Sequence, residues 1–342
     1  MSLSSQIFPQ QSLLENILGQ KLPGEDQEVQ LSSGRYVMKE GILRHSKIYS
    51  KTQAQTQSAF HFLWANEVLD HAAERFQENW FEEHFPGVRT ELRGILKPGS
   101  RVLDAGCGAG FSALAFFGAY LNEIQYLGVD ISGAADYAKK HFAERSRKGE
   151  FLQSSITTLP FSSEVVDFVF TPGVLHHTDS IAASLKSLTD ILVPGGRILL
   201  WVYRKQPPLR EFADDFIRQH LSVMNDQEAY KALVPLTKLG ETLGRLKVTL
   251  DVPEEIAFLG IPKGKMDLQR FFYYYVLKTF YNHTLPFERA NMQNFDWYRP
   301  LNAQTSTFEE MAQHCTKVNL EVERHWISPS GISILATKSL SR

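Results

Sequence analysis

The stretch RVLDAGCGAGFSALAFF, residues 101–117, decides the fold. It opens with five residues typical of a β-strand, continues with glycines at 106, 108 and 110, and ends in an apolar segment typical of a helix. Glycine accepts positive φ and has no side chain, so a glycine-rich turn between a strand and a helix lets a ligand touch the backbone. The stretch therefore predicts a ligand site at the carboxyl end of a strand.

The same alternation continues on both sides of this turn. Short aliphatic and aromatic runs typical of strands alternate with segments of helical periodicity as far as residue 203. A β-α-β rhythm of this kind predicts a parallel, doubly wound α/β sheet with helices on both faces. The expected strands are 101–105, 126–131, 150–156, 166–171 and 196–203, and the expected helices are 110–123, 132–149 and 180–192.

The rest of the chain surrounds this core. We expect an N-terminal extension with a helical cap over 1–95, the core over 96–203, a mostly helical lid over 204–300, and a final helix with a closing β-hairpin over 301–342. Residues 34–45 alternate as a short hairpin, and residues 50–85 read as one helix. Ser306 and Glu309 predict a capping box, 213–215 an exposed acidic helix face, and 271–281 an aromatic core segment.

Composition narrows the class of protein. The 342 residues carry a formal net charge of −2, so no overall basic field favours nucleic acid or an anionic membrane. The N-terminus lacks the pattern of a secretory signal, and no apolar segment reaches the length of a membrane span. Cys107 and Cys315 alone predict neither a disulfide framework nor a metal site, and they favour a reducing, cytoplasmic location.

Two acids decide between candidate ligands. Asp104 ends the first core strand, and Asp130 ends the second, twenty residues after Gly110, where a carboxylate can bind the hydroxyls of a ribose. A nicotinamide dinucleotide would need a third glycine where Phe111 stands, and Asp104 would repel its pyrophosphate. S-adenosylmethionine (SAM) carries an ammonium, a sulfonium and a ribose, and it fits two acids better.

The motifs together resemble one family. VLDAGCGAG, LGVDIS, LPF followed by VDFVFTPGVLHH, and LVPGGRILL are similar to successive motifs of the class I SAM-dependent methyltransferases, in the small-molecule branch of ubiquinone-type methylases. The resemblance covers residues 96–203 and, topologically, the closing hairpin. It implies a Rossmann-like, seven-stranded sheet in the order 3-2-1-4-5-7-6, with SAM lying across the carboxyl ends of the strands.

The resemblance also assigns cofactor residues. Asp104 and the glycine loop would face the methionine part, Asp130 the ribose, and Ile131 the adenine, while Thr171 would lie near the transferred methyl group. Ser155 stands where the family usually has an aspartate, which leaves the adenine contact to a hydroxyl or a carbonyl. The full set of expected cofactor residues is Asp104, Ala105, Gly106, Cys107, Gly108, Gly110, Asp130, Ile131, Ser155, Ile156 and Thr171.

Candidate catalytic residues follow the fourth and fifth strands. His176 and His177 come directly after the fourth strand, and a histidine has a pKa suited to a general base. Either histidine could instead cap or pack the next helix, and Asp179 could orient either one. Tyr203 ends the fifth strand at the same edge of the sheet, where it could also be core.

The lid and the N-terminal extension supply candidate substrate residues. The cluster NFDWYRP could hold a planar or cationic acceptor and bind an acid through arginine, or it could anchor the lid to the core. The expected substrate residues are Tyr49, Phe60, Asp296, Trp297, Tyr298 and Arg299, and no metal is expected.

These features predict an enzyme that transfers a methyl group from SAM to O, N or C of a small organic acceptor. The alternatives are an RNA or protein methyltransferase and a non-catalytic subunit with the same fold. The intact glycine loop and both acids favour catalysis. We expect a small-molecule acceptor as the partner, with no nucleic acid and no membrane, and the oligomeric state stays open.

Overall fold

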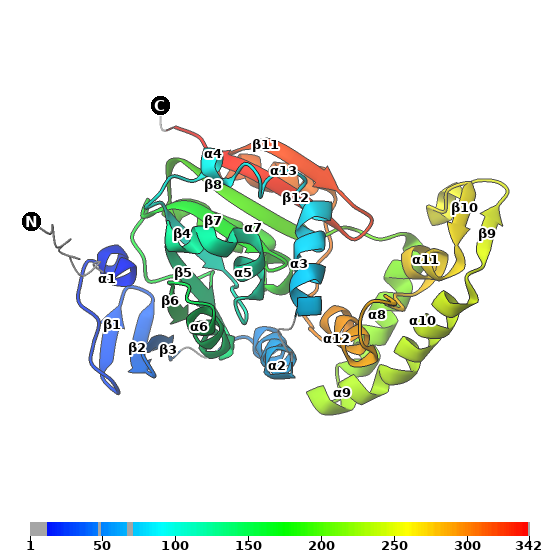
Figure 1. Ribbon diagram of the computed structural model, residues 1–342, viewed down its shortest axis with the longest axis horizontal. Helices are drawn as coiled ribbons and strands as arrows, with labels where there is room; N and C mark the ends of the chain where they lie inside the picture. The colour runs from blue at the N-terminus through cyan, green and yellow to red at the C-terminus, as the bar shows by residue number, and fades with distance from the viewer. Residues whose placement is uncertain (1–11, 47–48, 67–70, 341–342) are drawn as a thin grey trace, which may run out of the picture.

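The computed structural model describes residues 12–46, 49–66 and 71–340. Its centre is a ten-stranded sheet in the order β1-β2-β3-β6-β5-β4-β7-β8-β12-β11, which runs through the molecule from the N-terminal strands toward the lid (Figure 1). The strands are β1 (Glu28–Leu31), β2 (Gly34–Lys39), β3 (Ile42–His45), β4 (Arg101–Ala105), β5 (Gln125–Asp130), β6 (Glu150–Gln153), β7 (Val166–Pro172), β8 (Leu192–Tyr203), β11 (Leu320–Ile327) and β12 (Gly331–Lys338).

Seven of these strands follow the predicted order. Counted along the core, β6-β5-β4-β7-β8-β12-β11 is the order 3-2-1-4-5-7-6. The first five are parallel, and β12 lies antiparallel between β8 and β11. The expected doubly wound α/β fold class is confirmed.

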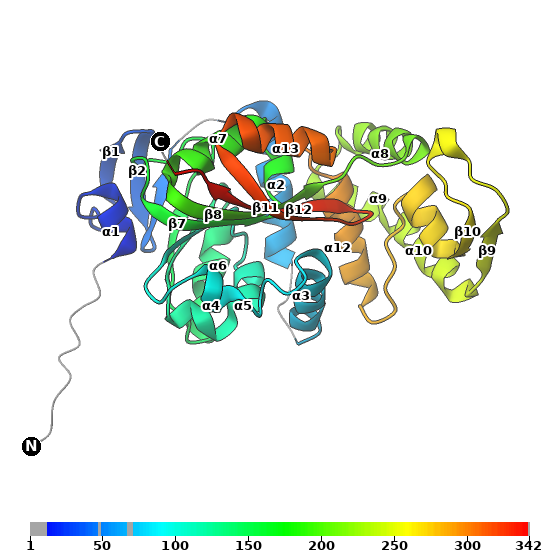
Figure 2. The same cartoon turned by 90° about the horizontal axis from the view of Figure 1, so that it is seen from above.

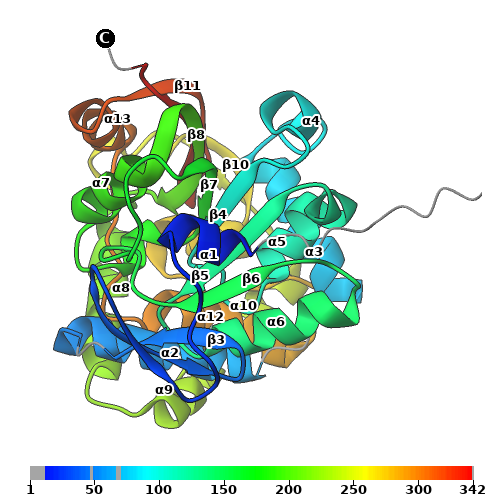
Figure 3. The ribbon, with the colours of Figure 1, turned by 90° about the vertical axis from the view of Figure 1, so that its left-hand side faces the viewer.

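Three N-terminal strands extend the sheet beyond the expected seven. The hairpin β2–β3 confirms the one predicted over 34–45, and β3 also pairs in parallel with β6 through Leu43 opposite Leu152. Arg44 fixes this junction, because its guanidinium bonds Asp136 at 2.6 Å. Figure 3 shows these strands and α1 (Leu13–Leu18) at the near end of the sheet. The extension is therefore part of the core sheet.

Helices cover both faces of the sheet, and each face has its own apolar core. Phe81, Phe116 and Phe170 pack on one face, and Leu188, Met311 and Ile334 pack on the other. Figure 2 shows α7 and α13 above the sheet and α3 to α6 below it. The covering helices are α3 (His71–His84), α4 (Leu92–Ile95), α5 (Phe111–Phe117) and α6 (Ala134–Glu144) on one face, and α1, α7 (Ile181–Ile191) and α13 (Phe308–Lys317) on the other.

Two predicted helix features need correction. The single helix expected over 50–85 is two helices, α2 (Lys51–Asn66) and α3, on either side of residues that lie outside the described chain. The capping box of α13 is formed by Thr307 and Glu310, one residue later than predicted. Ser306 instead pairs with the end of β8, because its N–H donates to the carbonyl of Tyr203 at 3.0 Å.

The lid, residues 204–300, is mostly helical as expected and also carries a small separate hairpin. One expectation fails there. Asp214, in the acidic run predicted to be exposed, is buried and bonds the guanidinium of Arg210 at 2.9 Å, whereas its neighbour Asp215 is exposed. The lid elements are α8 (Pro208–Leu221), α9 (Asp226–Ala232), α10 (Val234–Leu246), β9 (Thr249–Val252), β10 (Gly264–Asp267), α11 (Leu268–Phe271), a π-helical turn (Phe272–Val276) and α12 (Phe287–Tyr298).

Candidate active site

One large pocket, of about 780 Å³, lies at the carboxyl ends of the core strands. Its walls come from the loops after β4, β5 and β7, from the end of β8, from α2 and α3, and from the lid. Ligands of doubly wound sheets bind at this edge, because the strand order reverses there and leaves a crevice. The pocket is therefore the candidate active site.

The glycine loop forms the inner wall of the pocket. Gly106 has a φ of +87°, and its N–H donates to the carbonyl of Val129 at 2.7 Å, which holds the turn against β5. A Cβ at Gly106 would lie 2.4 Å from the methyl groups of Val174, so the loop is closed against the segment after β7. Gly106 and Cys107 line the pocket, whereas Gly108 and Gly110 shape the turn behind it.

Asp130 lies where the loop and β5 meet. Its Oδ2 accepts the N–H of Gly108 at 2.9 Å, and its Oδ1 accepts both the N–H and the hydroxyl of Ser132, at 2.8 and 2.7 Å. A carboxylate offers about four acceptor positions, so Oδ2 keeps one for a ligand hydroxyl. Burial raises the pKa of Asp130, while the bonds from Ser132 and Gly108 lower it.

Apolar residues flank this carboxylate. Ile131 and Ile156 line the pocket beside Asp130, and Ser155 lines it too. The hydroxyl of Ser155 lies 2.8 Å from that of Thr157. Gln57 of α2 fixes the backbone at this point, because its Nε2 donates to the carbonyl of Ile131 at 2.8 Å.

Like Gly108 and Gly110, three more expected cofactor residues are not among the lining residues: Asp104, Ala105 and Thr171. Asp104 is fully buried and accepts the hydroxyl of Tyr126 at 2.6 Å, and burial raises its pKa to about 7. Thr171 donates its hydroxyl to the carbonyl of Ala105 at 2.9 Å. The side chains of Asp104 and Thr171 thus stabilise the end of β4 and do not line the pocket.

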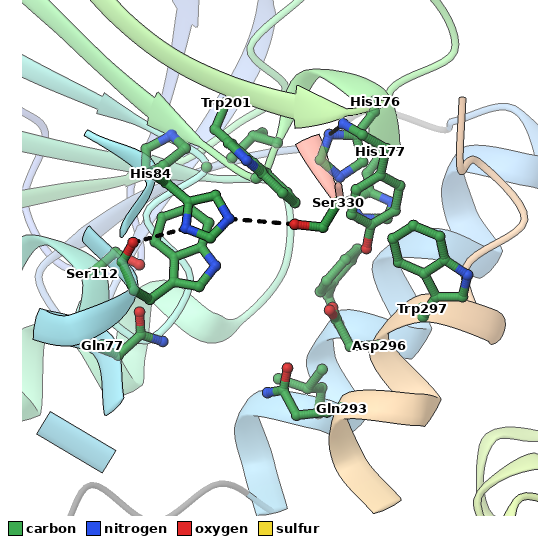
Figure 4. Close-up of a pocket in the computed structure, with 18 of the residues that line it drawn as sticks. Gln77, His84, Ser112, His176, His177, Trp201, Gln293, Asp296, Trp297 and Ser330 are labelled. Carbon is green, nitrogen blue, oxygen red and sulfur yellow. Dashed lines mark hydrogen bonds between the residues drawn. The ribbon is translucent and has the colours of Figure 1, made fainter. Parts of the chain in front are cut away.

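The two histidines line the pocket from the turn after β7 (Figure 4). Their rings contact that of Tyr203 at the end of β8. The Nδ1 of His177 lies 2.6 Å from the carbonyl of Asn302, so Nδ1 carries the proton. Burial lowers the pKa of His177 to about 3 and that of His176 far below its usual range. Rings with such low pKa values are neutral at physiological pH and are weak bases. Their burial therefore does not favour the predicted role of His177 or His176 as a general base.

The surroundings of His176 also differ from expectation. Its ring stacks on Tyr203 with centroids 3.7 Å apart, and its Nε2 has no hydrogen-bond partner within the described residues. Asp179, expected to orient a histidine, instead accepts from Ser50 and from the Nδ2 of Asn302. Asp179 therefore has no direct bond to the ring of His177 among the described residues, and it is linked to that residue through Asn302 and through Ser50 and Gln53.

The lid cluster divides into two halves. Asp296 and Trp297 line the pocket, but Tyr298 and Arg299 do not. The hydroxyl of Tyr298 donates to Asp214 at 3.0 Å, and Arg299 pairs with Asp226 at 2.8 Å. Tyr298 and Arg299 are thus anchors inside the lid, which corrects their predicted place in the substrate cavity.

Two expected residues come from the N-terminal part. Phe60 of α2 lines the pocket and meets the ring of His177 edge to face, with centroids 4.8 Å apart. Tyr49 is half-buried outside the lining. Burial raises the pKa of Tyr49 to about 12, and the nearby Asp130 contributes to that rise.

Sequence reasoning missed several polar residues of the pocket, among them Lys278 and His84. Lys278 comes from the lid segment that was predicted to be core, and it is buried. His84, at the end of α3, stacks on Trp80 with centroids 4.3 Å apart, and its Nε2 lies 3.3 Å from the hydroxyl of Ser330 (Figure 4). No local pattern marks either residue, because both reach the pocket through contacts distant in sequence.

The residues at the inner end of the pocket fit SAM. A buried carboxylate with one free acceptor position suits a ribose hydroxyl, and Ile131 and Ile156 offer apolar surface for an adenine. Gly106 brings bare backbone to the same wall. Among the described residues, no group of three or more His, Cys, Asp and Glu side chains could hold a metal ion. Within that same part of the chain, no helix has the length and apolar character needed to cross a membrane.

Comparisons with known proteins agree with this geometry. The methyltransferase-domain family matches residues 103–200. A phosphoethanolamine N-methyltransferase of Triticum aestivum is 30% identical over 138 residues, which are 40% of this chain and 27% of that protein. A tRNA U34 carboxymethyltransferase of Methylococcus capsulatus is 35% identical over 118 residues, which are 32% of this chain and 34% of that protein.

The chain thus spans only about a quarter to a third of these relatives. Among solved structures, magnesium protoporphyrin IX methyltransferase of Synechocystis aligns with a TM-score of 0.46 at 12% identity, over 86% of this chain and all of that one. The matched residues 103–200 contain the glycine loop, both acids and both histidines. Residues 103–200 therefore match a methyltransferase domain, as the sequence motifs predicted.

Proposed function

We propose that the whole chain transfers the methyl group of SAM to a small organic acceptor inside the pocket. One observation carries the proposal: a single cavity joins the glycine loop and Asp130 at one end to an aromatic space beneath the lid at the other. Such a cavity has room for two ligands side by side, and methyl transfer requires that arrangement.

The chain's own residues divide the work. Gly106, Asp130, Ile131 and Ile156 would hold SAM, which supplies an electrophilic methyl group when bound. The lid and α2 enclose the acceptor and exclude water, since both contribute to the cavity wall. His177 is neutral, and the carbonyl of Asn302 holds its proton on Nδ1. Its Nε2 can therefore accept a hydrogen bond from the molecule that receives the methyl group.

Cofactor binding is tested by replacing Asp130. Titration calorimetry should detect SAM binding, and Asp130→Ala should weaken it by about 1–3 kcal/mol, because a ligand hydroxyl loses its buried partner. Asp190→Ala, at an exposed acid on α7 that pairs only with Lys186 among the described residues, is the matched control and should leave the affinity unchanged. Equal SAM affinity in both variants and the wild type would remove Asp130 from the site.

The acceptor class is tested by activity. Incubation with methyl-labelled SAM and a metabolite extract should yield a labelled small molecule that mass spectrometry identifies. Failure to label any molecule, in protein that binds SAM, would favour a non-catalytic subunit.

A second candidate is an RNA methyltransferase, since a tRNA-modifying enzyme is among the relatives. The net charge of −2 disfavours it, because binding to phosphates needs lysine and arginine in excess. Labelled transfer RNA after incubation, together with binding that weakens steeply with salt, would support this candidate over the first.

A further inference from the structure

A row of aromatic side chains lines the acceptor end of the pocket. Trp80 of α3 meets Trp201 of β8 edge to face at 5.2 Å between centroids, Trp201 meets Tyr203 at 5.5 Å, and Tyr203 meets Trp297 of α12 at 4.1 Å. All four line the pocket. Aromatic faces and edges favour a flat, unsaturated ligand.

Lys278 stands at the lid end of this row. Its Nζ lies 4.1 Å from the centroid of the Trp297 ring, and the side chain lines the pocket while being almost wholly buried. Its hydrogen-bond contact among the described residues is a long one, 3.5 Å, to the carbonyl of Gln293. An ammonium has three protons to donate, so a ligand oxygen would complete its bonding.

The charges around Lys278 come from two lid helices. Asp296 of α12 and Asp214 of α8 favour its ammonium, and Arg210 and Arg218 of α8 oppose it. Arg210 and Asp214 are already bonded to each other. Asp296 also lines the pocket, and among the described residues no ion pair joins it to an arginine.

We propose that the acceptor is an aromatic molecule with a weakly acidic hydroxyl group, such as a phenol, and that Lys278 is the catalytic residue that binds this oxygen and takes its proton. The inference rests on the proposed methyl transfer and names the substrate class of the same site.

Burial supports this assignment by lowering the pKa of Lys278 to about 7, while Asp296 acts to raise it. A free amine is therefore well populated near neutral pH, which suits a general base. His177, whose pKa burial lowers to about 3, is far weaker. Of Lys278 and His177, Lys278 is accordingly the better-matched base.

Other acceptor classes fit less well. A carboxylic acid is already ionised at neutral pH and needs no base. A protonated amine would meet the ammonium of Lys278 and the sulfonium of SAM, both of like charge. An aliphatic alcohol is too weak an acid for an amine, whereas a phenol has a pKa of about 10, within reach of a base that also binds the anion.

The step balances in protons and electrons. The hydroxyl proton of the acceptor moves to the amine of Lys278, which becomes an ammonium and holds the phenolate oxygen. That oxygen forms a bond to the methyl carbon as the bond from this carbon to sulfur breaks, and its electron pair stays on sulfur. The ammonium of Lys278 afterwards releases its proton to solvent.

The test uses 4-nitrophenol, whose ionised form absorbs at longer wavelength than its neutral form. The full chain is titrated with it, without SAM, at a pH just below the midpoint of the free probe, where part of Lys278 is still a free amine. We expect the bound probe to show the phenolate band. Lys278→Met should remove that band and weaken binding at least about tenfold, because a charge-assisted bond is lost.

Two controls sharpen the test. Lys278→Arg keeps the cation but has no free amine, so it should bind the phenolate and release about one proton per probe into solution, more than the wild type releases. Lys238→Met, at an exposed position of α10, should behave as the wild type. Proton release follows from calorimetry in buffers of different ionisation heat.

The outcomes are separable. A phenolate band that persists in Lys278→Met, or binding of the neutral phenol by the wild type, overturns the inference even if the protein methylates another acceptor. Tighter, Lys278-dependent binding of benzoate than of 4-nitrophenol also overturns it, in favour of a carboxylic acid. A phenolate band that depends on Lys278, without any methyl transfer, would contradict the proposed function. It would still support phenolate binding by Lys278.

Discussion

Gly106 and Gly118 both adopt positive φ, +87° and +54°, but their surroundings differ. A Cβ at Gly106 would collide with Val174 at 2.4 Å, whereas a Cβ at Gly118 would meet nothing within 4 Å. The two positions therefore separate the cost of backbone strain from the cost of a blocked loop.

We expect Gly106→Ala to weaken SAM binding at least about tenfold and to lower the melting temperature, because the new methyl group displaces Val174 from the pocket wall. Gly118→Ala should lower the melting temperature through strain alone and keep the SAM affinity. Calorimetry and thermal unfolding measure the two effects. Equal loss of affinity in both variants would show that the loop is not a ligand wall.

Sequence motifs found the residues whose roles are local. Gly106, Asp130 and Ile156 occur in short motifs because the strand–turn–helix places them directly. The place of Lys278 in the pocket could not be predicted from the sequence, because it depends on packing against Trp297 of α12. The charges that act on its pKa come largely from α8. For Arg299 the sequence predicted a contact with an acidic ligand, because a guanidinium binds carboxylates. In the structure the guanidinium pairs with Asp226 of the lid.

At the scale of elements, a buried ion pair ties α8 to α12. Asp214 bonds the guanidinium of Arg210 and accepts from the indole of Trp297 at 2.8 Å and from the hydroxyl of Tyr298. Arg210 also donates to the carbonyl of Tyr273. This network holds the helix that carries Trp297, and hence one wall of the acceptor space.

We expect Asp214→Ala to lower the free energy of unfolding by about 3–5 kcal/mol, because it leaves Arg210 buried without its counter-charge. Asp215→Ala, at the exposed neighbour, should change it by less than about 1 kcal/mol. The double variant Arg210→Met with Asp214→Leu should recover only the part of the loss that comes from the unpaired Arg210, because Trp297 and Tyr298 still lose their acceptor. Denaturant unfolding measures all three, and a minor effect of Asp214→Ala would contradict a structural role for the pair.

Element prediction succeeded where periodicity was strong. The five parallel strands and the closing hairpin were read from alternation and glycine turns, and they form the core as predicted. The pairing of β3 with β6 could not be read, because it joins segments more than a hundred residues apart through two residue pairs. The acidic run at 213–215 misled for a similar reason, since the partners that bury Asp214 include α12.

At the scale of the whole molecule, burial shifts the pKa values of two titratable groups in opposite directions. His177 lies at the lid side, and Asp104 lies under the glycine loop within the sheet. Both are neutral in the folded protein near pH 5, one because burial lowers its pKa to about 3, the other because burial raises its pKa to about 7. Burial of His177 and burial of Asp104 therefore change the pH dependence of stability in opposite directions.

The sign of each effect follows from proton linkage. Between about pH 3 and 6.5, unfolded His177 binds a proton that the folded protein does not, so the free energy of unfolding rises with pH. Between about pH 3.8 and 7, folded Asp104 holds a proton that the unfolded chain releases, so the free energy of unfolding falls as pH rises. Each group contributes a slope of up to about 1.4 kcal/mol per pH unit.

Two variants should therefore tilt the pH profile of stability in opposite ways. His177→Gln should reduce the gain in stability between pH 4 and 6, and Asp104→Asn should increase that gain, each by up to about 1.4 kcal/mol per pH unit relative to the wild type. His220→Gln, at an exposed position of α8, is the control and should leave the profile unchanged. Denaturant unfolding at a series of pH values measures the profiles. Parallel profiles for all four proteins would mean that neither group is neutral in the folded state, and the site would then carry charges that its burial does not explain.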